Sequence, residues 1–305
     1  MPGFNLFVTL TRRVCSASLL ALLFGVSSGM VAGAQYHPDV SSSLVANAAT
    51  VLPRAAQDAH GQTVMLDAWF NSQQRKNAAG QMEYFHYKWN DTKNSGFSLL
   101  GQIFESHGVT LDTLYTAPTL EKLKNAQYYI IVSPDIPAKN PNPHYVQPED
   151  AKQVAEWVKQ GGVLVLMDND PANADIEHLD LIADRFGIHF NDVLSHHVVG
   201  DDYPAGQIRV TGGDTLFHNP HTLYMKDTCT ISVKSPARPL LEDKGDIMIA
   251  TAKYGKGTVV AVVDPWLYNE YTDPHKNPPL QDNYAAGKEF VSWLLQQSPA
   301  GNSAQ

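Results

Sequence analysis

The segments YYIIVS at residues 128–133, PEDAKQVAEWVKQ at 148–160 and VLVLM at 163–167 decide the fold of this 305-residue chain. The first and third are continuous apolar runs, which are typical of parallel strands buried on both faces. The middle segment begins with Pro148 and two acidic residues, and Gly161-Gly162 ends it, as expected for a helix. The stretch therefore predicts two parallel strands joined by a helix.

The same alternation continues on both sides of this stretch. It predicts an α/β domain over residues 63–297, with a mainly parallel sheet flanked by helices and a β-rich C-terminal part. Strands are expected at 64–70, 110–115, 223–233, 247–251 and 258–263. Helices are expected from Asn94 or Ser95 to Gly108 and at 120–125, 176–186 and 284–296.

The two ends of the chain differ from its middle. Arg12 and Arg13 precede an apolar stretch and the small residues Ala32-Gly33-Ala34, a pattern that predicts a signal peptide over residues 1–34. An uncleaved anchor is the alternative. Residues 35–62 are predicted to be a leader and 298–305 a flexible tail. We therefore expect an exported protein of the periplasm or the extracellular space, without membrane contact after cleavage.

Charge and cysteine content exclude several classes of protein. The formal net charge is −9, and no Lys/Arg-rich run is present, so nucleic acid is not an expected partner. Cleavage of the signal peptide would remove Cys15 and leave Cys229 alone, without a partner for a disulfide within the chain. Cys229 falls on the mostly apolar positions of an alternating segment, which predicts a buried structural thiol rather than a nucleophile.

Acids and amides follow several of the predicted strands. In open α/β sheets ligands bind beyond the carboxyl ends of the strands. Carboxylates and amides there can hydrogen-bond sugar hydroxyls, Trp and Tyr faces can pack on sugar rings, and paired carboxylates can act as general acid and base. Each residue also has a simpler interpretation, because an Asp after a strand often caps a helix and a Trp often belongs to the core.

The repetition at several strand ends predicts a carbohydrate site. Asp168 and Asp264 are the expected acid/base pair, with Asp135 and Glu270 as alternates. The expected substrate-binding residues are His86, Trp89, Asp91, Asn94, Asn169, Asp170, Trp266, Asn269 and Tyr271, with Trp89 and Trp266 as stacking platforms. Lys88, Arg185 and Lys276 are candidates for the positive charge that an acidic sugar would require.

No metal motif is complete in this sequence. Asp168-x-Asp170 is similar to the start of a calcium loop, but the Gly and the distal Glu are out of register. No HExxH or CxxC spacing occurs. We therefore expect no cofactor, with Ca²⁺ as the alternative.

Several stretches carry a family resemblance. Residues 128–134 and 148–166 resemble the class I glutamine amidotransferase-like superfamily, in its ThuA-like branch. Residues 86–97, 161–167 and 254–271 are similar to an uncharacterised domain that accompanies unsaturated rhamnogalacturonyl hydrolases of glycoside hydrolase family 105. The resemblance implies an amidotransferase-like, flavodoxin-like fold. Because Asp168-Asn169-Asp170 stands where those enzymes carry a catalytic Cys, glutaminase activity is excluded.

The resemblance and the acids at the strand ends together predict a function in pectin degradation. We expect an exported, carboxylate-dependent hydrolase that acts on uronate-containing oligosaccharides of the plant cell wall. The alternative is a non-catalytic carbohydrate-binding or assembly domain that accompanies a glycoside hydrolase. The acids would then only hydrogen-bond the ligand or cap helices.

Overall fold

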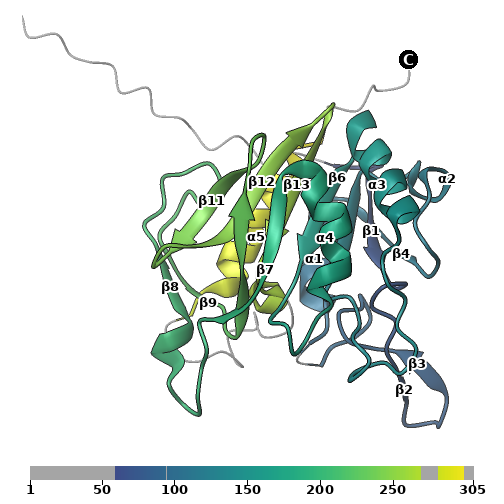
Figure 1. The fold of residues 1–305 in the computed structure, drawn as a ribbon, viewed down its shortest axis with the longest axis horizontal. Helices are drawn as coiled ribbons and strands as arrows, with labels where there is room; N and C mark the ends of the chain where they lie inside the picture. The colour runs from purple at the N-terminus through teal and green to yellow at the C-terminus, as the bar shows by residue number, and fades with distance from the viewer. Residues whose placement is uncertain (1–58, 94, 269–280, 299–305) are drawn as a thin grey trace, which may run out of the picture. The chain divides into compact units, whose positions relative to one another are not determined.

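A computed structural model describes residues 59–93, 95–268 and 281–298 (Figure 1). These residues form an α/β fold around one large mixed sheet, in the order β4-β1-β5-β6-β13-β12-β10-β7, with β11 also paired to β12. The α/β class is confirmed. The predicted signal peptide, nearly all of the predicted leader and all of the tail beyond residue 298 lie outside the described residues.

One half of the sheet is parallel, as the apolar runs predict. β5 (Tyr128–Val132) and β6 (Val163–Met167) are buried along their whole length and lie side by side. β1 (Thr63–Asp67) and β4 (Thr110–Leu114) continue the parallel half on one side, and β13 (Gly257–Val262) follows β6 on the other. All five strands therefore end at the same edge, which we call the carboxyl edge.

The other half is antiparallel, so the expectation of a mainly parallel sheet is wrong. It consists of β12 (Asp246–Tyr254), β11 (Arg238–Asp243), β10 (Thr228–Val233) and β7 (Ile188–Ser195). β7 and β11 carry polar or exposed residues at many positions. A search for apolar runs in the sequence therefore does not detect these two strands. The predicted strand at 223–233 is in fact two strands, β9 (His221–Tyr224) and β10, because Asp227 adopts a left-handed backbone with φ 52°.

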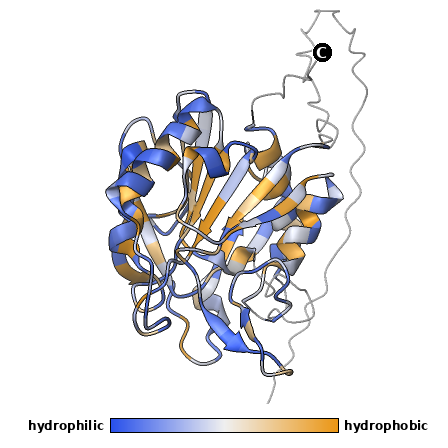
Figure 2. Cartoon of the chain, turned by 90° about the vertical axis from the view of Figure 1, so that its right-hand side faces the viewer, coloured by the Kyte–Doolittle hydropathy of each residue, from blue (hydrophilic) through white to orange (hydrophobic). Residues whose placement is uncertain are grey.

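Five α-helices within the described residues cover the two faces of the sheet. α3 (Pro148–Gln160) has the predicted bounds and packs with α2 (Leu120–Leu123) and α4 (Ile176–Ala183). α1 (Ser98–Ser106) and α5 (Asn283–Leu295) pack against each other. The strands in the interior are mostly apolar, whereas the helices place polar residues outward (Figure 2). Among the described residues, no helix combines the length and apolar character needed to cross a bilayer.

A glycine lies where α3, β6 and β13 meet. β13 begins at Gly257, and a Cβ atom there would lie 2.1 Å from the carbonyl oxygen of Val158 and 2.3 Å from that of Gly162. Both oxygens belong to the backbone, so neither can rotate away. The close approach of α3 to the sheet therefore depends on the absence of a side chain at this position.

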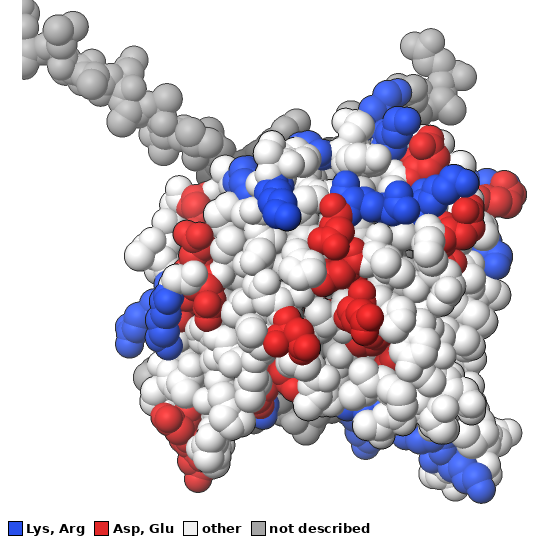
Figure 3. Space-filling view, in the orientation of Figure 1, with Lys and Arg blue, Asp and Glu red and all other residues white. Residues whose placement is uncertain are grey.

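Small elements complete the described part of the chain. β2 (Gln74–Lys76) and β3 (Met82–Tyr84) form one hairpin, and β8 (Gln207–Val210) and β9 form another. Three short 3₁₀ helices lie at Asp184–Phe186, Tyr203–Gly206 and Pro265–Leu267. On the face drawn in Figure 3, basic side chains gather near the upper margin and acidic ones over the middle.

Candidate functional site

Acidic and polar residues follow four of the parallel strands at the carboxyl edge. Asp67 ends β1, Ser133 follows β5, and Asp168 follows β6. Asp264 lies two residues beyond the end of β13. All four side chains are buried, so the edge differs from an open row of carboxylates.

Asp135 organises the loops and is fully engaged in doing so. Its Oδ2 accepts hydrogen bonds from the backbone N–H of Ser72 at 2.8 Å and from Nδ2 of Asn140 at 2.7 Å. Its Oδ1 accepts one from Nε2 of Gln73 at 2.7 Å. Hydrogen bonds of this number hold a carboxylate in one orientation, and here they tie the loop after β1 to the loop after β5.

Asp168 and Asp264, the predicted acid/base pair, are both fully buried, with exposed fractions of 0%. Both raise the pKa of the Tyr87 phenol and of the Cys229 thiol, although burial is the larger cause for each group. Oδ2 of Asp264 accepts a hydrogen bond from the backbone N–H of Lys226 at 2.9 Å. General acid/base catalysis requires contact with a substrate. In this conformation neither carboxylate is accessible to a substrate.

Asp168 has an unusual environment for a carboxyl group. Its Oδ1 accepts a hydrogen bond from the backbone N–H of Asn169 at 3.0 Å, whereas Oδ2 has no hydrogen-bond partner among the described residues. Burial raises its pKa well above the ordinary value, and the charges of Asp180, Asp175 and Asp170 raise it further. This environment therefore favours the neutral form of the carboxyl group more than water does.

Asn169 and Asp170 shape the turn after β6. Oδ1 of Asn169 accepts the backbone N–H of Asp170 at 2.9 Å, and Oδ1 of Asp170 accepts that of Ala172 at 3.0 Å. Asp175 is the residue before α4 whose side chain caps the helix. Neither Asp168 nor Asp170 therefore caps it.

The loop between β3 and α1 carries backbone strain. His86 and Tyr87 both have positive φ, at 65° and 56°, and Ser133 on the neighbouring loop has φ 37°. Such conformations are costly for residues with a side chain and persist where surrounding contacts impose them. Here Asp91 supplies one such contact, since its Oδ2 accepts the backbone N–H of His86 at 3.0 Å. Asp91 therefore positions the loop.

His86 is a neutral imidazole whose tautomer can be assigned. Because Nε2 of Gln73 donates to Asp135, Oε1 of Gln73 faces Nδ1 of His86 at 3.3 Å, so Nδ1 carries the proton. Burial lowers the pKa of His86 to about 3, and the charges of Lys139 and Lys88 contribute. Its Nε2 has no hydrogen-bond partner among the described residues and can accept one from a ligand.

Lys88 is buried beneath His86. Its ammonium group donates to the carbonyl oxygen of Asn71 at 2.8 Å, to Oδ1 of Asn71 at 2.9 Å and to the carbonyl oxygen of His86 at 3.0 Å. Burial lowers its pKa to about 8, although Asp67, Asp135 and Asp91 act in the opposite direction. Lys88 thus joins the two loops that follow β1 and β3.

The aromatic residues at this edge are not those expected from the sequence. Trp89 packs against Phe97 and Phe104, and its Nε1 donates to the carbonyl oxygen of Asp112 at 2.9 Å. It belongs to the packing of α1 rather than to a platform for sugars. Trp69 instead stacks on His144 with ring centroids 3.5 Å apart, and both rings are half-buried.

Lys139 is the edge residue that the sequence interpretation missed. It is half-buried in the loop after β5, and its ammonium group donates to Oδ1 of Asn173. Its position could have been suspected, since it follows the buried strand YYIIVS by only six residues.

The three cations expected from the sequence lie in different places. Lys88 lies at the edge, Arg185 is exposed on the 3₁₀ helix after α4, and Lys276 lies outside the described residues.

Part of the predicted site cannot be placed. Asn94, Asn269, Glu270 and Tyr271 lie outside the described residues, as does the side chain of Trp266. Within the described residues, one group has a composition and spacing able to hold a metal ion, formed by Asp180, Asp184 and His189. Nδ1 of His189 lies 3.1 Å from a carboxylate oxygen of each Asp, so contacts between the imidazole and the two carboxyl groups account for this geometry.

Solved structures similar to this chain share its fold at low sequence identity. The N-terminal domain of mmIFT52 aligns with a TM-score of 0.57 at 14% identity, over 79% of this chain and 100% of that one. The cytoplasmic protein STM1381 from Salmonella typhimurium LT2 aligns with a TM-score of 0.50 at 13% identity, over 78% and 100%. At these identities the likeness concerns the fold alone.

One similar structure is an enzyme that acts on sugars. The exo-β-1,4-mannosidase Op5Man5 from Opitutaceae bacterium strain TAV5 aligns with a TM-score of 0.45 at 15% identity, over 78% of this chain but only 36% of the enzyme. A likeness this weak carries no argument about activity. None of the curated proteins matches the chain.

The comparisons correct the family expected from the sequence. The family model that matches covers residues 90–281, almost two thirds of the chain, and is described as a domain of unknown function, DUF4350. Together with the mmIFT52 and STM1381 structures, this match shows that the predicted membership of the class I glutamine amidotransferase-like superfamily is wrong. The chain belongs to the DUF4350 family.

Proposed function

We propose that this protein is a binding domain for acidic oligosaccharides, which it contacts at the carboxyl edge without cleaving them. The observation that carries the proposal is the presence of two lysines, Lys88 and Lys139, among the carboxylates of this edge. Lys139 and Lys88 both lower the pKa of His86, so an anionic group placed near this imidazole would be attracted by both cations.

The groups around Lys139 suit a hydroxylated ligand. Asn140 donates to Asp135 and to Oγ of Ser72 at 3.0 Å, and the stacked rings of Trp69 and His144 lie in the same loops. Half-buried amides, hydroxyls and aromatic rings are the groups that proteins use to hold sugars. The ligand class is uronate-containing oligosaccharide, and pectic fragments are the members to test first.

The burial of Asp168 and Asp264 supports binding over hydrolysis. A retaining glycosidase places two carboxyl groups about 5 Å apart, and an inverting one about 6.5–9.5 Å apart, on opposite sides of the scissile bond. That arrangement requires both groups to face the substrate. The proposal keeps the protein in the periplasm or outside the cell, where its predicted signal peptide would direct it, and includes no metal.

The Lys139→Gln variant tests the role of the edge. We expect it to bind trigalacturonate about tenfold more weakly than the unmodified protein, because one partly desolvated charge contact is worth about 1.4 kcal/mol. Titration calorimetry at low salt, with and without added Ca²⁺, measures the affinity. Lys152→Gln, an exposed position on α3, is the matched control and should stay within about twofold.

Two results would contradict the proposal. Equal affinity for a neutral trisaccharide of the same size would show that charge does not select the ligand. Products of trigalacturonate found by mass spectrometry, and absent with the Asp168→Asn/Asp264→Asn double variant, would instead make the protein a hydrolase with the acids first expected from the sequence.

A further inference from the structure

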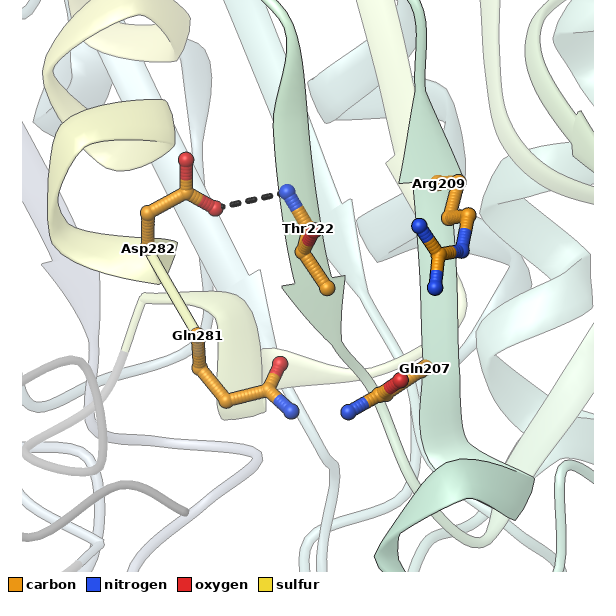
Figure 4. Close-up of a pocket in the computed structure, with 5 residues that line it drawn as sticks. All are labelled: Gln207, Arg209, Thr222, Gln281 and Asp282. Carbon is orange, nitrogen blue, oxygen red and sulfur yellow. Dashed lines mark hydrogen bonds between the residues drawn. The ribbon is translucent and has the colours of Figure 1, made fainter. Parts of the chain in front are cut away.

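A cavity of about 400 Å³ lies between the β8–β9 hairpin and the chain just before α5 (Figure 4). Its volume falls at the small end of the range for ligand sites, about 300–1,000 Å³. Five residues with polar or charged side chains line it, namely Gln207, Arg209, Thr222, Gln281 and Asp282. The sequence interpretation assigned no role to any of these residues.

The hairpin presents one polar face to the cavity. Gln207 and Arg209 are two residues apart on β8 and so share a face, and Thr222 of β9 lies directly opposite Arg209. Ile208 and its partner Leu223 point to the other side, where both are fully buried. Apolar packing behind the hairpin therefore holds the polar side chains in place.

Gln281 brings an unsatisfied amide to this cavity. Neither its Nε2 nor its Oε1 has a hydrogen-bond partner within the described ranges, and both atoms are shielded from solvent. Figure 4 shows this amide pointing toward that of Gln207. A buried amide without partners costs folding free energy, and native proteins rarely retain one without reason. A ligand that offers both a donor and an acceptor would satisfy it.

The charges at the cavity favour an anion. Arg209 is exposed and forms no ion pair with any described residue. The carboxylate of Asp282, by contrast, is already engaged, since Oδ1 accepts the backbone N–H of Thr222 at 2.8 Å and Oδ2 lies 2.8 Å from Nδ1 of His221. The cavity thus offers a guanidinium group that no described residue pairs, and guanidinium binds carboxylates through two parallel hydrogen bonds.

We propose that this cavity is a second ligand site, which takes a hydroxylated carboxylic acid of monosaccharide size. The carboxylate binds Arg209, and the hydroxyl groups exchange hydrogen bonds with the amides of Gln281 and Gln207. The site is formed by β8, β9 and the two residues just before α5, and no residue of the carboxyl edge contributes to it. It can therefore exist whether or not the edge binds oligosaccharides.

The first test uses D-galacturonate as the probe and D-galactose as its neutral counterpart. We expect the unmodified protein to bind galacturonate at least tenfold more tightly than galactose, measured by chemical-shift changes in NMR titrations. Arg209→Gln should remove this preference. Arg238→Gln, at an exposed arginine on β11 outside the cavity, should keep it. Equal binding of the two sugars, or an equal loss in both variants, would overturn the inference.

The second test separates a binding role for Gln281 from a structural one. Gln281→Met removes the unpaired amide while keeping the volume of the side chain. We expect its unfolding midpoint in urea to be equal to or above that of the unmodified protein, while galacturonate affinity falls at least tenfold. A lower midpoint with unchanged affinity would make the amide structural and overturn the proposed site.

The Lys139→Gln variant distinguishes this inference from the proposed function. It should bind galacturonate within twofold of the unmodified protein, because Lys139 does not line the cavity. If Lys139→Gln loses galacturonate binding and Arg209→Gln keeps it, the cavity is not the site and the carboxyl edge is. A third outcome is possible: the protein does not bind trigalacturonate, Lys139→Gln has no effect, and Arg209→Gln abolishes galacturonate binding. The proposed function would then be wrong, whereas the inference about the cavity would stand.

Discussion

Replacing Gly257 with alanine is expected to destabilise the fold by about 4 kcal/mol or more. The new methyl group would lie 2.1 Å from the carbonyl oxygen of Val158 and 2.3 Å from that of Gly162. Relief of this clash requires α3 to move away from β13, which would disturb two adjacent strands at the centre of the sheet. Urea unfolding followed by circular dichroism would give the change in the free energy of unfolding.

Gly245→Ala is the matched control for this experiment. Gly245 has a positive φ of 92°, but no atom lies within 4 Å of its would-be Cβ. The substitution therefore imposes only conformational strain, which costs about 1–3 kcal/mol. If Gly257→Ala unfolds at the same urea concentration as Gly245→Ala, then α3 does not approach the sheet as closely as the structure indicates.

The second large effect is expected for Lys88→Met. The variant leaves the carbonyl oxygen and Oδ1 of Asn71 and the carbonyl oxygen of His86 without their buried donor. It also removes the positive charge beside Asp67, whose pKa is raised to about 6 by burial although Lys88 acts to lower it. We expect a loss of about 3 kcal/mol at pH 7, typical of removing one member of a buried polar group.

The pH dependence of this loss gives a specific signature. The pKa of Lys88 is about 8 in the folded protein and 10.5 without the protein environment, so between these values the unfolded chain binds more protons. Stability must then rise with pH across this window, by about 3 kcal/mol for this group. The difference in stability between the unmodified protein and Lys88→Met should therefore widen from pH 8 to 10.5. Lys152→Met, at an exposed position on α3, is the control.

The parallel half of the fold could be predicted from the sequence because its signals are local. The continuous apolar runs of β5 and β6, and the Pro and Gly residues that bound α3, each act within a few residues. The antiparallel half could not be predicted, since β7 and β11 pair through the backbone while exposing many polar side chains. Asp227 divides the expected strand at 223–233 because its backbone has a positive φ. The neighbouring residues in the sequence do not predict this conformation.

The candidate site was predictable in position but not in chemistry. Acids do follow the strands, yet whether a carboxylate faces a ligand or a loop depends on contacts between distant segments. Asp135 bonds with Ser72 and Gln73, which lie more than 60 residues away. Gln281 and Arg209 meet at the cavity from positions 72 residues apart in the chain, so no motif search would join them.

The place of β13 in the sheet has a consequence for folding kinetics. β13 ends at Val262, late in the chain, yet it lies between β6 and β12 and so joins the parallel half to the antiparallel half. Until it docks, one edge of β6 has no partner strand, and the two half-sheets cannot close into one. During synthesis on the ribosome, the earlier strands therefore cannot complete the sheet until this segment has been made. Contacts between positions so far apart in sequence make folding slow and leave an aggregation-prone edge exposed meanwhile.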